Sequence, residues 1–181
     1  MKTFRCSFSI LEPWSKGDWD EAIRRFYKTS IKVTPQMQAG RLMHEQWRAE
    51  TNQTSCLPAV FGGKPLDPFK CEEKMECTLD GWLNFVGIVD CMENHTIHEY
   101  KTGAADSLTY SRTMQTKVYQ LLCAENAYYP NQAVIRHYNQ YTQRVTTSYQ
   151  YLSAKTLEYG REWIITNASE MANAMEEAGQ L

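Results

Sequence analysis

The sequence lacks a long apolar run: no stretch approaches the roughly 20 apolar residues of a membrane-spanning helix. Residues 1–9 have no apolar core of the kind that a secretory signal contains, so we expect a cytoplasmic protein that does not contact a membrane. No sign of charge dominates either, because 21 acidic residues stand against 19 basic ones, a net charge of -2. This balance excludes a generally basic nucleic-acid coat but leaves room for a local basic cleft.

Paired cysteine spacing is also lacking. The six cysteines form no CxxC pair, and in a domain of this size without a secretory signal we expect reduced thiols. They are Cys6, Cys56, Cys71, Cys77, Cys91 and Cys123. A zinc-stapled interaction domain is an alternative that predicts stoichiometric zinc, and the missing paired spacing argues against it.

The composition is that of an ordinary globular protein. Hydrophobic residues make up 43% and charged residues 22%, which excludes disordered, collagen-like and coiled-coil classes. A chain of 181 residues buries roughly 70% of its unfolded surface, so it can fold without disulfide bonds or a structural metal. We therefore expect residues 1–181 to form a single domain.

The hydrophobic periodicity predicts an α+β or mixed α/β protein with the element order ααβββαββα. Thr34 and Pro35 are typical of a helix start, and Asp80-Gly81 and Asn94-His95 are turn dipeptides that separate three antiparallel strands. We expect a loop at 51–68, helices at 18–29, 35–48, 108–127 and 153–177, and strands at 74–79, 82–92, 96–102, 133–141 and 144–152.

Two carboxylates and a lysine are predicted to meet on this sheet. Glu99 and Lys101 are two residues apart on one strand and share a face, and Asp90 reaches Glu99 across the hairpin turn. Such close carboxylates are stable when a cation lies between them, and their oxygens suit Mg²⁺ or Mn²⁺. The lysine would orient or deprotonate a water, or neutralise charge on a phosphate. The alternative is a solvated strand face with a weak ion pair.

Flanking residues add donors to this group. His44 lies four residues after Gly40 on one helix face, where imidazole is a competent Mn²⁺ ligand and glycine allows close approach of another backbone. The alternative is a core histidine. Gln115 and Tyr119, one helical turn apart, offer an amide and a phenol that bind phosphate or a base edge, or else make a surface contact.

Four motifs together resemble the PD-(D/E)XK nuclease superfamily, and within it the RecB-type nuclease domain and its CRISPR-associated relatives. They are Gly40-Arg-Leu-Met-His44, Gly87-Ile-Val-Asp90, Glu99-Tyr-Lys101-Thr-Gly103 and Gln115-Thr-Lys-Val-Tyr119. The resemblance implies a restriction-endonuclease-like core, in which helices flank a central mixed sheet.

The resemblance also implies a role for each matching residue. Asp90 and Glu99 would be metal carboxylates, and His44 and the backbone carbonyl of Tyr100 would be further ligands. Lys101 would position the attacking water, because a neutral lysine would need a large depression of its pKa.

Gln115 and Tyr119 would bind the substrate strand or hold the site. The implied activity is hydrolysis of DNA phosphodiester bonds with Mg²⁺ or Mn²⁺, by an exonuclease that acts on single strands or duplex ends. No iron–sulfur cluster is expected, because no cysteine follows Cys123 to supply the three C-terminal ligands found in many members of this branch.

The chain has no helicase segment, so we expect either a stand-alone nuclease domain or a subunit that depends on a helicase or recombination partner. A homo-oligomer is a further alternative. The competing hypothesis is a nucleic-acid-binding accessory subunit of a DNA-processing complex with a weak or inactive site. The complete set of Asp90, Glu99 and Lys101 argues against such decay.

Two surface features bear on DNA binding. Six basic residues stand against one acid, Glu45, between positions 24 and 48, and they form either a phosphate-binding patch or solvated helix faces: Arg24, Arg25, Lys28, Lys32, Arg41 and Arg48. Six tyrosines are sheet residues or a stacking surface, with the sheet favoured: Tyr128, Tyr129, Tyr138, Tyr141, Tyr149 and Tyr151.

Overall fold

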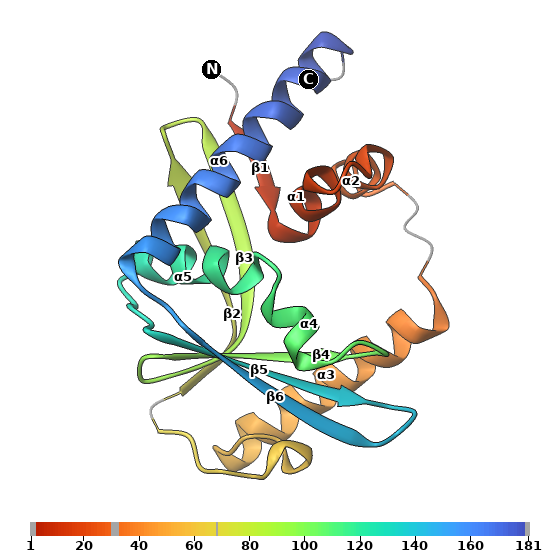
Figure 1. The fold of residues 1–181 in the computed structure, drawn as a ribbon, viewed down its shortest axis with the longest axis vertical. Coiled ribbons are helices and arrows are strands. Elements are labelled where there is room, and N and C mark those ends of the chain that lie inside the picture. The colour runs from red at the N-terminus through yellow and green to blue at the C-terminus, as the bar shows by residue number, and fades with distance from the viewer. Residues whose placement is uncertain (1–2, 30–32, 68, 180–181) are drawn as a thin grey trace.

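A central mixed sheet carries helices on both faces, as the sequence predicts (Figure 1). The computed structural model describes residues 3–29, 33–67 and 69–179. The strands are β1 (Phe4–Ser7), β2 (Phe69–Leu79), β3 (Leu83–Glu93), β4 (Thr96–Thr102), β5 (Gln132–Asn139) and β6 (Arg144–Tyr151). The helices are α1 (Phe8–Ser15), α2 (Trp19–Phe26), α3 (Pro35–Thr54), α4 (Ser107–Ser111), α5 (Gln115–Glu125) and α6 (Ala154–Glu177), with a 3-10 turn η1 (Ala59–Phe61).

The central strand β3 has two neighbours on one edge and a single neighbour on the other. Along one edge β2 pairs antiparallel with its whole length. On the opposite edge β1 pairs in parallel with Leu83–Val86, and β4 pairs antiparallel with Cys91–Glu93. The sheet then continues through β5, parallel to β4, to the edge strand β6. Residues 87–90 of β3 therefore lie in a gap between two ladders.

Each face of the sheet has its own core. The larger core packs α1, α5 and α6 against residues such as Phe85 and Leu122, which are fully buried. The smaller core lies under α3 and contains Trp47 and Tyr100. A fully buried leucine or phenylalanine stabilises the fold by roughly 1.5–3 kcal/mol relative to exposure, so the larger core fixes the sheet on which the candidate site is built.

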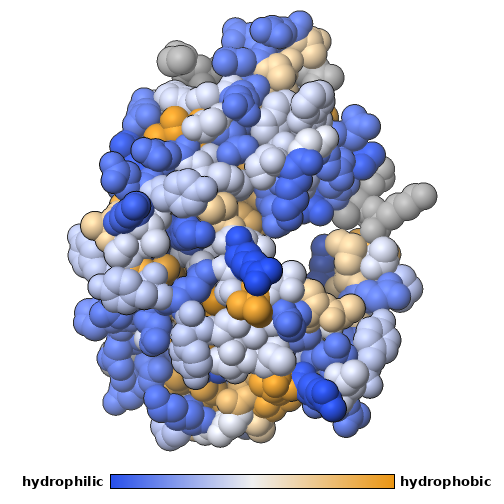
Figure 2. All heavy atoms as spheres, viewed as in Figure 1, coloured by the Kyte–Doolittle hydropathy of each residue, from blue (hydrophilic) through white to orange (hydrophobic). Residues whose placement is uncertain are grey.

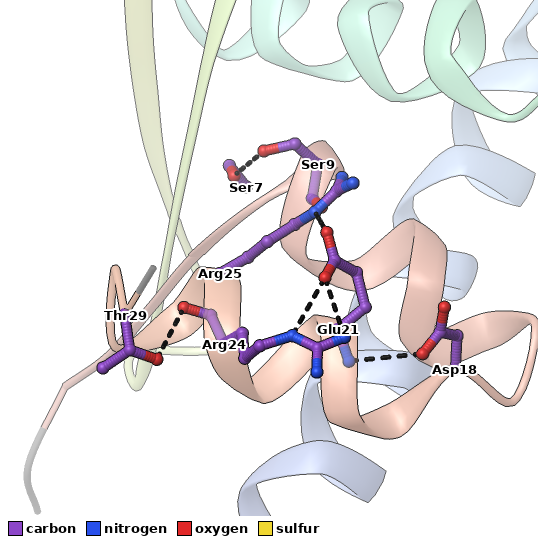
Figure 3. Close-up of polar contacts among 7 residues, drawn as sticks. All are labelled: Ser7, Ser9, Asp18, Glu21, Arg24, Arg25 and Thr29. Carbon is purple, nitrogen blue, oxygen red and sulfur yellow. Dashed lines mark hydrogen bonds and ion pairs between the residues drawn. The ribbon is translucent and has the colours of Figure 1, made fainter. Parts of the chain in front are cut away.

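A proline inside α1 is accommodated by an arginine from α2. Figure 3 shows this arginine, Arg25, beside Ser9 of α1. Pro13 has no N–H to donate to the carbonyl of Ser9, the residue four positions earlier in the helix. The Arg25 guanidinium donates to this carbonyl at 2.8 Å. Arg25 thereby ties α1 to α2.

Most predicted elements are confirmed, with the following differences. The predicted loop at 51–68 is wrong in part, because it contains the last residues of α3 and the 3-10 turn η1. β2 begins at Phe69, five residues before the predicted strand at 74–79, because it pairs with β3 as far as Glu93. α3 continues to Thr54, beyond the predicted end at 48, because no helix breaker intervenes before Ser55, which adopts the left-handed conformation. The helix predicted at 108–127 is two helices, α4 and α5, and the hydroxyls of Ser111 and Thr113 donate to carbonyls at the end of α4. The elements β1 and α1 were not predicted.

The surface is hollowed between the part of the molecule that carries α1 and α2 and the part that carries α3 and the β5–β6 hairpin (Figure 2). Within the ranges that the structure describes, no helix combines the length and apolar content needed to cross a bilayer.

Candidate active site

The candidate site lies where β3 and β4 diverge. Their backbone ladder ends at the Cys91–His98 pair. At the next residue of β3, the Asp90 side chain makes the hydrogen bond between the two strands: its Oδ2 accepts the backbone N–H of Tyr100 at 2.7 Å. A side chain thus replaces a ladder hydrogen bond, which brings Asp90 next to Glu99 as the hairpin predicts.

Glu99 lies at the centre of the site and is only 2% exposed. Its Oε1 accepts hydrogen bonds from Lys101 Nζ at 2.6 Å and from Gln115 Nε2 at 2.8 Å. Its Oε2 is buried and has no hydrogen-bond partner in the part of the chain that the structure describes. A buried carboxylate oxygen without a partner is costly, and a bound cation would satisfy it.

The two carboxylates are difficult to ionise together. Burial raises the pKa of Asp90 to about 6, although Lys101 opposes the rise. Burial and the nearby Asp90 raise the pKa of Glu99 to about 7. Burial alone would lower the pKa of Lys101, but the charges of Glu99 and Asp90 outweigh it and raise this pKa. The site thus favours an added positive charge beside the carboxylates.

His44 reaches the site because α3 packs closely on the end of β4. A Cβ on Gly40 would lie 2.8 Å from Thr102 Oγ1, so glycine is required for this approach. His44 Nδ1 then lies 3.9 Å from Asp90 Oδ1. Burial lowers the pKa of His44, which keeps the imidazole neutral and able to bind a metal.

Glu72 joins the site and was missed in the sequence. On β2, Cys71 pairs with Cys91 and Glu73 with Val89, so Glu72 lies opposite Asp90. Its backbone is left-handed, with φ of 54°, an uncommon conformation that concentrates at functional positions. One ligand atom each from His44, Glu72 and Asp90 lie within 4.8 Å of one another.

This donor set fits a divalent metal. Carboxylate oxygens together with one imidazole nitrogen suit Mn²⁺. Mg²⁺ prefers oxygen ligands, so it suits a set of this kind with fewer nitrogen ligands. His44, Glu72 and Asp90 would hold the ion. Glu99 is not part of this group of ligand atoms, although its carboxylate interacts electrostatically with Asp90 and His44. The side chain of Tyr100 packs against Trp47 in the smaller core, so only its backbone carbonyl remains a candidate ligand, and that role stays a prediction.

Gln115 and Tyr119 form a support behind Glu99. The Gln115 amide donates to Glu99 Oε1 and, at 3.0 Å, to the Tyr119 hydroxyl. Tyr119 is buried. Its ring lies against Gly87, because a Cβ built on Gly87 would be 3.2 Å from the Tyr119 ring. Of the two predicted roles, this geometry favours holding the site over binding the strand.

An open cleft of about 820 Å³ lies above these residues. His44, Glu72 and Lys101 line it, so the candidate site is accessible from solvent. The walls come from α3, the end of β4 and the β5–β6 turn. Because the cleft is open, it can admit a substrate that extends beyond it.

The predicted basic patch is divided. Arg24 and Arg25 both pair with Glu21 on α2, at 3.1 and 2.8 Å, so this carboxylate compensates part of their charge (Figure 3). Arg41 and Arg48 instead line the cleft. Lys32 lies outside the described residues.

The tyrosines and cysteines fall into separate groups. Tyr128 and Tyr138 pack against the two cores, whereas four tyrosines are more than two-thirds exposed: Tyr129, Tyr141, Tyr149 and Tyr151. All six cysteines are free. The group of potential metal ligands found among the described residues contains no cysteine, which further weakens the zinc alternative.

Comparisons with known proteins agree with this geometry. The sequence model of one family, described as PD-(D/E)XK nuclease superfamily, matches residues 10–179. No curated relative matches the chain.

Similar folds occur in solved structures. The alkaline exonuclease LHK-Exo of Laribacter hongkongensis is 10% identical with a TM-score of 0.56, over 97% of this chain and 92% of that one. Its complex with dAMP gives 12% identity and a TM-score of 0.50, over 96% and 93%. The crystal structure of SSO0001 gives 12% and 0.52, over 92% and 78%. At these identities the likeness establishes the fold alone.

Proposed function

Because this chain belongs to the PD-(D/E)XK nuclease superfamily, we propose that it is a metal-dependent deoxyribonuclease that acts as an exonuclease. The observation that carries the proposal is the group of potential ligand atoms from His44, Glu72 and Asp90, together with the buried Glu99 carboxylate, one oxygen of which has no partner among the described residues. Members of this superfamily use divalent metals, and we propose Mg²⁺ or Mn²⁺ here.

Each side chain has a defined part in the proposed chemistry. His44, Glu72 and Asp90 would hold the cation, and Glu99 and the Tyr100 carbonyl would be further ligands. When bound, the cation polarises the phosphoryl oxygen and lowers the pKa of a bound water.

Lys101 carries a positive charge, because its pKa is raised. It therefore orients the attacking water and stabilises negative charge on the phosphate, and does not act as the general base. Gln115 acts through Glu99, whose carboxylate it fixes by a 2.8 Å hydrogen bond.

The assignments of DNA as substrate, of cleavage from an end and of the RecB-type branch rest on the resemblance and on one protein of similar fold. LHK-Exo is named an alkaline exonuclease, and one of its structures contains dAMP, which supports DNA as substrate and cleavage from an end. The four sequence motifs support the RecB-type branch. We further propose that residues 1–181 act as one nuclease domain.

End-labelled DNA tests the proposal. Purified protein is incubated with single- and double-stranded DNA labelled at either end, with Mg²⁺, Mn²⁺ or EDTA. Lys101→Ala should abolish cleavage, whereas Lys74→Ala, which removes an exposed lysine of β2, should leave it unchanged. Full activity in Lys101→Ala would contradict the mechanism, and DNA binding without cleavage under any metal would support an accessory subunit.

A further inference from the structure

Two side chains face the cleft from opposite walls and have no part in the chemistry described above. Arg41 lines it from α3 and Tyr141 from the β5–β6 turn. We propose that the cleft binds single-stranded DNA, with Arg41 on a backbone phosphate and Tyr141 stacked on a base. This inference rests on the proposed nuclease function and names its substrate class.

Helical spacing places Arg41 beside the candidate metal centre. Arg41, His44 and Arg48 follow one another at intervals of three and four residues, so they share one face of α3. All three line the cleft. A phosphate held by Arg41 therefore lies about one helical turn from His44, next to the position where a scissile phosphate would bind.

Arg41 differs from the other basic residues of the cleft in its pairing, although Glu45, one turn further along α3, also lines the cleft. Lys101 bonds Glu99 at 2.6 Å, and Arg48 lies 3.8 Å from the Glu72 carboxylate. Arg41 is exposed and has no carboxylate at ion-pair distance within the ranges that the structure describes. An unpaired guanidinium in an open cleft is suited to a phosphate, which it binds in bidentate geometry.

Tyr141 is presented by a rigid turn. The Asn139 side chain accepts the backbone N–H groups of Tyr141 and Thr142, both at 3.0 Å. The Tyr141 side chain is 74% exposed, and no aromatic ring of the described chain pairs with it. These hydrogen bonds hold the backbone of the turn, and the exposed ring has a free face at the cleft, as in stacking platforms for single strands.

Stacking of a base on the Tyr141 ring distinguishes single-stranded from double-stranded DNA as the ligand of the cleft. Bases within a duplex stack on each other, whereas unpaired bases leave both faces free for a protein aromatic ring. A base stacked on Tyr141 must therefore belong to a single strand or an unpaired end. Tyr149 provides a matched control, because it is similarly exposed on β6 but does not line the cleft.

Binding in EDTA separates this inference from catalysis. The probes are a single strand containing 2-aminopurine and a blunt hairpin duplex of the same length, whose loop is a linker without bases. Tyr141→Ala should weaken single-strand binding roughly 5- to 140-fold and abolish the stacking quench of 2-aminopurine. Tyr141→Phe and Tyr149→Ala should retain both, and hairpin binding should not change.

The salt dependence of binding tests the arginine. Arg41→Ala should reduce the slope of log affinity against log salt by about 0.7, the value for one phosphate contact on a single strand. Arg144→Ala, which removes an exposed arginine outside the cleft, should leave the slope unchanged.

Unchanged affinity and quench in Tyr141→Ala would overturn the inference, as would an equal loss on the hairpin. If the wild type nevertheless cleaves DNA with metal, the proposed function stands without it. Stacking by the wild type without metal-dependent cleavage would support the inference and refute the nuclease.

Discussion

Replacing Glu99 by glutamine is expected to stabilise the metal-free protein while abolishing its activity. The pKa of Glu99 rises from 4.5 to about 7 on folding. At roughly 1.4 kcal/mol per pKa unit, the ionised side chain costs the metal-free fold up to about 3 kcal/mol at pH 8. Glutamine keeps the Oε1 acceptor for Lys101 and Gln115 and removes the charge.

Thermal unfolding in EDTA measures this effect. For a domain of this size about 3 kcal/mol corresponds to a rise in Tm of roughly 6–12 °C at pH 8. The advantage of Glu99→Gln over the wild type should grow as the pH rises from 5 to 8, because a carboxyl with a raised folded-state pKa stabilises the fold only while protonated. The comparison between the two proteins cancels the titration of His44 and His98, whose lowered pKa values act in the opposite direction.

Metal addition should narrow the difference. Mn²⁺ should raise the Tm of the wild type by mass action and raise that of Glu99→Gln less, because the variant keeps His44, Glu72 and Asp90 but lacks the negative charge of Glu99. The control is Glu73→Gln on β2, a more exposed carboxylate near Lys70, where a change within about 0.5 kcal/mol is expected. Equal Tm values for the wild type and Glu99→Gln at pH 8 would refute the reasoning.

Three further predictions concern packing and charge. Lys101→Ala should abolish cleavage but retain Mn²⁺ binding by calorimetry, because lysine is not a ligand; loss of binding would contradict this role. Gly40→Ala places a methyl group against Thr102, so cleavage should fall more than tenfold and recover in Gly40→Ala/Thr102→Ala; an active single variant would show that the contact is unimportant. Gly160→Ala would bring a Cβ within 2.7 Å of the Lys117 carbonyl, so urea unfolding should show a loss of roughly 1–3 kcal/mol, and an unchanged midpoint would disprove a tight α5–α6 contact.

The sequence was sufficient for the hairpins and for the pair of carboxylates. Asp80-Gly81 and Asn94 adopt positive φ at the two turns, so local turn chemistry determines where the strands pair. The strand predicted at 96–102 is β4 itself. The approach of Asp90 to Glu99 follows from the second turn, and the outcome is a hydrogen bond to Tyr100 rather than a regular ladder.

Non-local contacts account for what was missed. β1 is a four-residue strand that pairs in parallel with β3, far away in sequence, and parallel pairing leaves no local turn signal. Glu72 lay outside the predicted strand at 74–79. Extending the register of the Asp80-Gly81 turn by seven residues would have placed it opposite Asp90.

The gap on the edge of β3 affects how mutations at the site are interpreted. Between Val86 and Cys91 that edge has neither β1 nor β4 as a backbone partner, and the hydrogen bond from Tyr100 to Asp90 crosses the gap. Asp90→Ala would therefore remove a metal ligand and loosen the join between the two parts of the sheet at once. Asp90→Asn retains an acceptor for Tyr100, so comparing the two variants separates the loss of chemistry from the loss of sheet integrity.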